Sequence, residues 1–327
     1  MFKAILLNRI NKTTHAELLN LDESQLPEGD VEVRVEYSTL NYKDALAITG
    51  RGAIVKNWPL IPGIDLSGIV ESSTHPDWQP GQRVVVTGWG LGEDRWGGLS
   101  QKARLKSEWL LAIPEAYSSL QSMAIATAGF TAALCVMALQ RHGLKAGEGE
   151  ILVTGAAGGV GSIAVALLAG LGYQVSASTG RVSEADYLHT LGASHIVDRA
   201  EFLAPGKPLQ SERWAGVVDT VGSHTLANAC ASTRWNGAVA ACGLAQGADF
   251  PATVLPFILR GVTLYGINSV YIDNNTRRVA WDLLAKHVDA AKLQPMIVEI
   301  ALSEVIEYAP QLIDGKVRGR TVVDVNR

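Results

Sequence analysis

The chain has 327 residues, more than a single hydrophobic core usually spans, so we expect two domains. Hydrophobic residues make up 47% and charged residues 18% of the sequence, and the net charge of −4 gives no electrostatic reason to bind nucleic acid or an anionic membrane. The three cysteines are far apart in the sequence and cannot form a disulfide framework, which fits a reducing compartment. With an N-terminus that lacks the apolar core of a signal peptide, these features predict a cytoplasmic protein.

The first third of the chain reads as β-rich. Four runs favour strands, with Gly, Pro and Asp clusters between them that are typical of turns: FKAILL, VEVRVEYSTL, GIVESS and QRVVVTGW. The NYKD segment that follows the second run is expected to form a turn, and the alternative to a functional role is that its Asn and Asp only cap the backbone. From about Met123 the pattern changes, and AIATAGFTAALCVMALQRHG predicts a buried helix that ends at Gly143.

A regular alternation of strands and helices follows. The predicted strands are ILVT, YQVSAS, HIV, GVVDTV, GAVAACG and TLYGIN, with helical segments between them. Six apolar strands in this arrangement predict a doubly wound parallel sheet of the α/β class. The tail carries a helix at 276–287, the strand VEIAL, another helix and the strand RTVVDV. We expect this tail to return to the N-terminal β domain, giving one domain of residues 1–126 plus 271–327 and an inserted Rossmann domain of 127–270.

The uncharged stretch 151–180 allows a rival interpretation as a membrane span, but the six glycines between 155 and 172 divide it into strand, turn and helix. Its core is Thr154-Gly155-Ala-Ala-Gly158-Gly159-Val-Gly161, placed between a predicted strand and a predicted helix. In that context the glycines permit a tight turn and close approach of a pyrophosphate, and the helix N-terminus offers free N–H groups. The alternative to cofactor binding is that these glycines only allow a tight turn between strand and helix.

The end of the second strand indicates which cofactor binds. NAD-binding folds place an acidic residue there to hold the ribose hydroxyl, but this chain has Ser178-Thr179-Gly180-Arg181. Arginine and hydroxyl groups suit the 2′-phosphate of NADPH. Arg199, just past the third strand, is a second candidate for that phosphate, and the alternative for each arginine is an ordinary solvated surface residue.

Several other chemistries lack their signatures. The cysteines and histidines do not have the spacing of structural or catalytic zinc ligands, and no G-x-S-x-G elbow for a serine hydrolase occurs. The glycine pattern also matches short-chain dehydrogenases, but none of the eight tyrosines is followed by lysine at the spacing Tyr-x-x-x-Lys. A zinc-free reductase is therefore favoured.

The chain as a whole resembles the acrylyl-CoA reductase group (the YhdH/YhfP-type quinone oxidoreductases) of the zinc-free medium-chain dehydrogenase/reductase superfamily. The resemblance covers nearly the full length and rests on specific strings: LPEGDV, STLNYKDALAITG, PLIPGIDLSG, GQRVVVTGWGLGEDRWGG, ATAGFTAALCVMAL, VTGAAGGVGS, VAACGLA, LPFILRGVTLYGINSV and GRTVV. It implies a GroES-like β-barrel catalytic domain, an inserted Rossmann domain, and a cleft between them for nicotinamide and substrate.

The same resemblance implies a set of NADPH contacts: Tyr42, Ala157, Gly158, Gly159, Val160, Thr179, Gly180, Arg181, Arg199, Leu244, Ile258, Ser269 and Arg320. Arg320 is expected to add charge to the cofactor phosphates. For Leu244 and Ile258, plain packing is nearly as good an explanation.

The implied reaction is hydride transfer to the activated double bond of a small enoyl thioester, such as acrylyl-CoA. Asn41 and Tyr42 are the candidates for positioning substrate and nicotinamide, and a donor to the developing oxyanion is typically worth about 3 kcal/mol. Four cations are candidates for CoA phosphates, with no preference among them: Lys43, Arg51, Arg83 and Arg95.

Two other functions stay open at this point, a quinone reductase and a non-catalytic NADPH-binding sensor. The apolar strand TLYGIN is expected at a sheet edge, a liability unless it is paired or covered. Relatives commonly pair subunits there, so a homodimer is expected.

Overall fold

In the computed structural model, which describes all 327 residues, the chain forms two compact units. The first comprises Met1–Thr127, Val270–Val279 and Met296–Arg327, and the second comprises Ala128–Ser269 and Ala280–Pro295. The expected division ended the inserted domain at residue 270. It did not anticipate that residues 280–295 would pack with the second unit.

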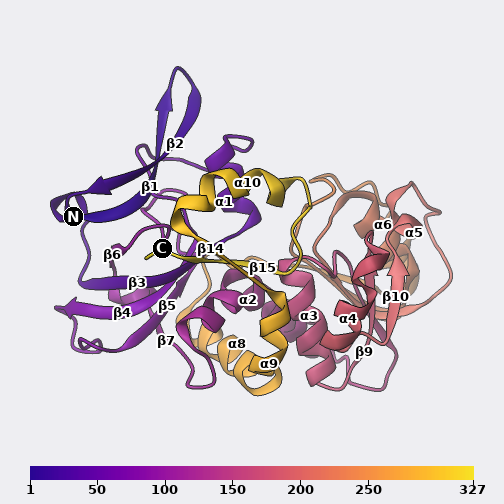
Figure 1. Ribbon diagram of the computed structural model, residues 1–327. Helices are drawn as coiled ribbons and strands as arrows, with labels where there is room; N and C mark the ends of the chain where they lie inside the picture. The colour runs from indigo at the N-terminus through magenta and orange to yellow at the C-terminus, as the bar shows by residue number, and fades with distance from the viewer. The chain divides into compact units, whose positions relative to one another are not determined.

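The first unit is built on a seven-stranded sheet of order β14-β15-β3-β4-β5-β7, with β6 also paired to β3. A separate antiparallel hairpin joins β1 to β2 (Figure 1). The strands are β1 (Phe2–Ile10), β2 (Thr13–Leu21), β3 (Val31–Leu40), β4 (Asp65–Ser73), β5 (Arg83–Thr87), β6 (Lys102–Leu105), β7 (Leu111–Ala112), β14 (Ile297–Ala301) and β15 (Arg320–Asp324).

The alternation of apolar and charged residues explains why β3 forms a strand in this unit. Val31, Val33 and Val35 of β3 are buried in its core, and charged residues alternate with them along the strand. The sequence analysis missed β2, because TTHAELLNL has no clear alternation. The strand forms as the partner of β1 across a turn at Asn11 and Lys12, which both adopt positive φ, so the hairpin turn determines the pairing.

The NYKD segment is a second difference, because an α-helix forms where a turn was expected. Helix α1 (Tyr42–Thr49) begins directly after β3 and ends at Gly50, which adopts the left-handed conformation with φ 66°. Asn41 is its N-cap residue, and the backbone N–H of Asn41 donates to the Asp44 carboxylate at 2.8 Å. Helix α10 (Val305–Ile313) lies beside α1 (Figure 1).

The second unit is a six-stranded parallel sheet of order β10-β9-β8-β11-β12-β13, which confirms the predicted doubly wound topology. Its strands are β8 (Glu150–Val153), β9 (Gln174–Thr179), β10 (His195–Asp198), β11 (Trp214–Asp219), β12 (Thr233–Ala241) and β13 (Thr263–Gly266). The helices of this part of the chain are α2 (Ser119–His142), α3 (Gly159–Gly170), α4 (Ala185–Leu191), α5 (Ala200–Leu203), α6 (Ser223–Ser232), α7 (Leu255–Arg260), α8 (Asn274–His287) and α9 (Ala290–Leu293).

Burial accounts for the apolar runs in this unit. Strand β11 is buried along its whole length, and residues 161–168 of α3 are all buried, so neither segment shows an exposed polar face. By length and composition alone, α2 could cross a membrane, but 89% of its most apolar 18-residue stretch is buried within the structure. Residues 151–180 form β8, a turn, α3 and β9, as the glycines predicted.

Arg277, a buried cation, ties the segment before α8 to β5 within the first unit. Its Nε donates to the Ile272 carbonyl at 2.9 Å, Nη1 to the Thr87 carbonyl at 2.9 Å, and Nη2 to the Val270 carbonyl at 2.8 Å. The guanidinium carbon lies 4.7 Å from the centre of the Trp89 ring. Burial lowers the pKa of Arg277 to about 10, so the group keeps its charge at neutral pH.

We predict that Arg277→Met destabilises the protein by about 2–4 kcal/mol, because three carbonyl acceptors lose a charged donor in a buried place. Arg278→Met is the matched control, since Arg278 is exposed and donates to Asn275 of its own helix. Thermal unfolding of both variants measures the difference. Equal melting temperatures would contradict this role for Arg277.

Candidate functional site

The phosphate-binding turn lies between β8 and α3, at the carboxyl end of the parallel sheet. Gly155 adopts φ 59°, and Gly158 is the N-cap residue of α3, whose first turn carries no acidic residue. A Cβ on Gly161 would lie 2.3 Å from the Gly155 carbonyl oxygen, so only glycine permits this approach of helix and turn. Ala157, Gly158, Gly159 and Val160 thus form a helix N-terminus suited to an anionic group.

A buried hydrogen-bond network holds the base of this turn. Thr154 Oγ1 donates to the Asp219 carboxylate at 2.7 Å, and the backbone N–H of Gly222 donates to the same carboxylate at 2.8 Å. Burial raises the pKa of Asp219, and the hydrogen bonds oppose that shift. The network joins the ends of β8 and β11. Thr154 belongs to the glycine motif seen in the sequence, whereas no sequence pattern pointed to Asp219.

The two arginines expected at the 2′-phosphate lie at the ends of adjacent strands. The backbone N–H of Arg181 donates to Thr179 Oγ1 at 3.1 Å, and the N–H of Arg199 donates to the Thr179 carbonyl at 3.1 Å. The Arg199 side chain lies against Gly180, where a Cβ would be 2.2 Å from its Nε. The structure therefore brings Thr179, Gly180, Arg181 and Arg199 together at the end of β9.

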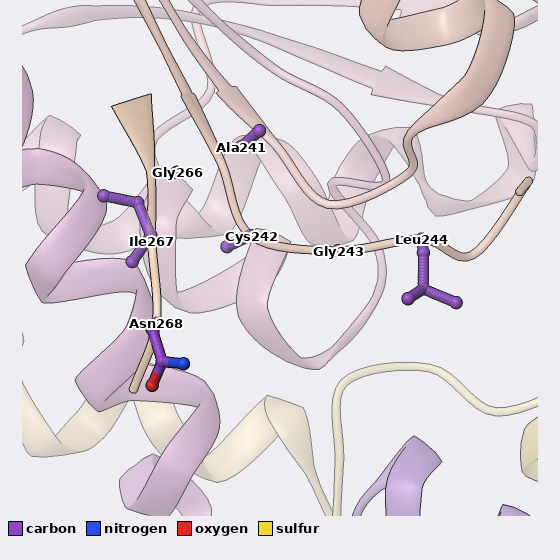
Figure 2. A pocket seen from close by; sticks show the side chains of 7 residues that line it. All are labelled: Ala241, Cys242, Gly243, Leu244, Gly266, Ile267 and Asn268. Carbon is purple, nitrogen blue, oxygen red and sulfur yellow. The ribbon is translucent and has the colours of Figure 1, made fainter. Parts of the chain in front are cut away.

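A pocket opens at the carboxyl ends of β12 and β13 (Figure 2). Seven residues line it: Ala241, Cys242, Gly243, Leu244, Gly266, Ile267 and Asn268. Leu244 lies where the resemblance implied, and its side chain extends from the loop after β12 (Figure 2). Ser269 follows directly and its hydroxyl accepts from Thr131 Oγ1 at 3.0 Å. Ile258 is on α7, exposed, and does not line this pocket.

Cys242, which lines this pocket, interacts with the buried Cys135 despite their separation in the sequence. All three are free thiols. The Cys135 thiol of α2 interacts with the Cys242 thiol, and this contact together with burial raises the pKa of Cys135 well above its usual value. Cys242 Sγ also lies 3.3 Å from the Asp219 carbonyl oxygen. Distance along the sequence was therefore a poor guide to their distance in the fold.

In the first unit, Asn41 and Tyr42 differ sharply in their surroundings. The Asn41 amide Nδ2 donates to Thr39 Oγ1 at 2.7 Å, to Asp65 at 2.8 Å and to Asp44 at 3.1 Å. Three acceptors use up its two N–H groups, so it has no donor left for a substrate. Tyr42 is the first residue of α1 and is 39% exposed. This favours a positioning role for Asn41 and leaves Tyr42 as the group able to meet a substrate.

Two buried carboxylates complete this cluster. Asp44 accepts from the backbone N–H groups of Gly63 at 3.2 Å and Ile64 at 2.9 Å. Burial, with the nearby charge of Asp65, raises the pKa of Asp44 to about 6, although hydrogen bonds oppose the shift. The sequence indicated Asp44 only as a residue that serves the backbone of NYKD, and it did not indicate Asp65. An aspartate within the otherwise uncharged stretch IPGIDLSGIV was the available signal, because an isolated acid in an apolar run indicates a buried charge.

Arg320 is buried in the same cluster. Its Nη1 donates to Asn41 Oδ1 at 3.1 Å and its Nε donates to the Ala124 carbonyl at 2.8 Å. Burial lowers the pKa of Arg320, while the charges of Asp65 and Asp44 oppose that shift. These contacts favour a role in holding Asn41 over the contact with cofactor phosphates that the resemblance implied.

The four cations considered for CoA phosphates all have partners inside the first unit. Lys43 pairs with Glu93 at 2.8 Å and Arg51 with Asp314 at 3.4 Å. Arg83 donates to the Tyr117 carbonyl at 2.9 Å, and Arg95 donates to the Trp89 carbonyl. None of them therefore stands out as a phosphate ligand. The structure also contains no group of three or more His, Cys, Asp or Glu residues that could hold a metal ion.

Comparison with known proteins places the whole chain. Residues 27–115 match the alcohol dehydrogenase GroES-like domain, and residues 159–286 match the family described as zinc-binding dehydrogenase. "Probable acrylyl-CoA reductase AcuI" of Escherichia coli K12 is 51% identical over 99% of this chain and 100% of the relative. Acrylyl-CoA reductase AcuI of Ruegeria pomeroyi is 49% identical over 100% of both chains.

A solved structure of similar sequence has the same fold over the whole chain. The yhdH oxidoreductase of Salmonella enterica, crystallised in complex with NADP, is 50% identical, covers 99% of each chain and has a TM-score of 0.96. A more distant Bacillus subtilis relative with a provisional quinone oxidoreductase name, YhfP, is 39% identical over 99% of this chain and 98% of the relative. The chain therefore belongs to the acrylyl-CoA reductase family of the medium-chain dehydrogenase/reductase superfamily.

Proposed function

We propose that the protein is an NADPH-dependent reductase that saturates the activated double bond of a small enoyl thioester, with acrylyl-CoA as the substrate and propionyl-CoA as the product. Full-length identity of 49–51% to acrylyl-CoA reductases carries the choice of substrate. The arginines and glycine turn at the carboxyl edge of the second unit support the choice of cofactor.

The residues at that edge fit NADPH on their own chemistry. The N-terminus of α3, with its glycines and no acidic residue, suits the pyrophosphate. Arg181 and Arg199 suit the 2′-phosphate, and no carboxylate in Ser178–Arg181 repels it. NADPH, when bound, supplies the hydride that reaches the β-carbon of the substrate.

Charge develops on the thioester oxygen as the β-carbon gains hydride. A hydroxyl that donates to that oxygen stabilises the enolate, and such donors act mainly in the transition state. Tyr42 is our candidate for this donor, because its ring is partly exposed at the start of α1 while Asn41 is fully engaged. Tyr42 or solvent then supplies the proton to the α-carbon. No residue is assigned to the CoA phosphates.

The direct test is the oxidation of NADPH by the purified protein with acrylyl-CoA, beside a simple quinone as acceptor and NADH as reductant. Turnover of acrylyl-CoA with NADPH in strong preference to NADH supports the proposal. Turnover of the quinone alone identifies a quinone reductase instead, and NADPH binding without turnover of either acceptor identifies a non-catalytic sensor.

Arg181→Ala is expected to raise KM for NADPH about 10- to 100-fold with little effect on KM for NADH, because a hydrogen bond to a charged phosphate is lost. Arg141→Ala is the matched control. Arg141 is exposed at the end of α2, and its neighbour His142 contacts Asn236 near the start of β12, away from the carboxyl edge. A parallel rise in both KM values would contradict the assignment of Arg181.

Tyr42→Phe is expected to lower kcat for acrylyl-CoA roughly 10- to 100-fold while the Kd for NADPH stays nearly constant, because only the hydroxyl is removed. Tyr308→Phe, on the neighbouring helix α10, controls for loss of a tyrosine hydroxyl in the same unit. If Tyr42→Phe leaves kcat and KM unchanged, Tyr42 does not take part.

We also propose a cytoplasmic homodimer that pairs through the edge of the second unit. Strand β13 is the edge strand of its sheet, and α7 next to it exposes Ile258 and Leu259. Leu259→Glu is expected to convert a dimer into a monomer of 34.8 kDa in light scattering. Leu203→Glu, on α5, serves as the control, and a wild-type protein that is monomeric at micromolar concentration would refute the pairing.

A further inference from the structure

The first unit contains a cluster of buried charges that the proposed chemistry does not use directly. The buried Asp, Glu, Lys and Arg side chains of this unit are Asp44, Asp65, Arg277 and Arg320, two acids and two bases. Burial lowers the pKa of both arginines, and the charge of Asp65 opposes that shift in each. Burying four charges is costly, and apolar residues of similar volume often give a more stable fold.

Asn41 lies where this cluster meets helix α1. Its Nδ2 donates to Asp44 at 3.1 Å and to Asp65 at 2.8 Å, while its Oδ1 accepts from Arg320 at 3.1 Å. Its backbone N–H donates to Asp44 at 2.8 Å. The amide nitrogen and the amide oxygen of Asn41 are therefore both held by buried charged groups, those of Asp44, Asp65 and Arg320.

The position of Tyr42 follows from these contacts. Tyr42 comes directly after Asn41 and opens α1, and the Asn41 carbonyl accepts from the N–H of Ala45 at 3.0 Å. Asp44 lies in the same first turn and is itself held by the N–H groups of Gly63 and Ile64. The backbone on both sides of Tyr42 is therefore tied to the Asp44 carboxylate.

Asp44 is the member of the cluster whose charge can change under mild conditions. It accepts four N–H hydrogen bonds, all of which favour the carboxylate, yet burial and Asp65 raise its pKa to about 6. Asp65 on β4 and Arg320 on β15 are the charged groups that face it. The other elements packed against α1 carry Glu307 and Tyr308 on α10, and His15 and Glu17 on β2, of which only Tyr308 is not exposed.

We propose that Asp44 is a positioning residue for the reaction, which acts through Asn41 to hold Tyr42 in the geometry that hydride transfer requires. This inference rests on the proposed reductase function. When Asp44 gains a proton, at least one of its four N–H partners loses an acceptor, and the first turn of α1 loosens. Tyr42 then loses its alignment with the substrate oxygen, while NADPH sites in the second unit are unaffected.

The wild-type enzyme is expected to lose kcat as the pH falls, with a midpoint near the Asp44 pKa of about 6. Asp44→Asn is expected to lower kcat at least about tenfold at neutral pH, because a small misplacement of a reacting group is enough to slow the reaction by that much. The variant is also expected to lose this acid limb, because it has no carboxylate at position 44 to titrate. The Kd for NADPH, measured by fluorescence, stays within about twofold, since the variant leaves the second unit unchanged.

A double-mutant cycle separates positioning from mere structure. If Asp44 acts through Tyr42, adding Asp44→Asn to Tyr42→Phe has no further effect on kcat. Losses that multiply would overturn the proposal. Asp30→Asn is the matched control, because Asp30 is another hydrogen-bonded carboxylate of the same unit, which accepts from the N–H and the hydroxyl of Ser107. It is expected to keep both kcat and the acid limb.

Should Asp44→Asn fail to fold, the pH profiles of wild type and Tyr42→Phe decide the question without it. The proposal requires an acid limb near pH 6 in wild type that is absent in Tyr42→Phe. A wild-type profile that is flat in this range, or the same limb in both proteins, overturns it. The absence of any wild-type turnover of acrylyl-CoA overturns the reductase function and this inference together, whereas multiplying losses in an active enzyme overturn only the inference.

Discussion

The buried carboxylate of Asp65 connects three segments of the first unit by hydrogen bonds, and the arrangement of these segments depends on it. It accepts from Thr39 Oγ1 at 3.0 Å, from Asn41 Nδ2 at 2.8 Å, and from both the N–H and the hydroxyl of Thr127. These donors belong to the end of β3, the cap of α1 and helix α2. The Thr127 N–H donates to Asp65 directly after Ala126, whose φ of 39° interrupts helix α2. A buried charge with this many donors is satisfied, and removing it would take one acceptor away from each of these donors.

The second unit depends on a different constraint, the direction of its strands. All six strands are parallel, so the loops that follow them gather at one edge of the sheet. The glycine turn, the two arginines at the end of β9 and the pocket of Figure 2 all lie in these loops. Because Gly161 has no Cβ, α3 can approach the turn closely. The hydrogen bond from Thr154 Oγ1 to the Asp219 carboxylate holds the start of the turn in place. The residues proposed to bind the anionic cofactor therefore lie in the second unit, and Tyr42, the proposed hydrogen-bond donor to the substrate, lies in the first.

The sequence predicts the parts of this account that depend on short-range pattern. Six apolar runs separated by helices specify the parallel sheet, and the glycines before α3 specify the turn, because both signals are local and strong. Strand β2 escapes prediction because its pairing comes from the hairpin turn, and α1 escapes because eight residues show little periodicity. The acid cluster and the Cys135–Cys242 contact depend on residues far apart in the chain, so no local pattern reveals them. Among the residues transferred by resemblance, Leu244 lines the pocket, and Arg320 is buried and donates to Asn41 and to the Ala124 carbonyl.

The central claim is that hydride passes from NADPH to the β-carbon of an enoyl thioester. Reaction of acrylyl-CoA with NADPH carrying deuterium at the transferred C4 position, followed by mass and NMR analysis of the product, tests it most directly. The account predicts propionyl-CoA with one deuterium, located on the β-carbon, and a solvent proton on the α-carbon. Product without deuterium, or with deuterium on the α-carbon, would contradict it.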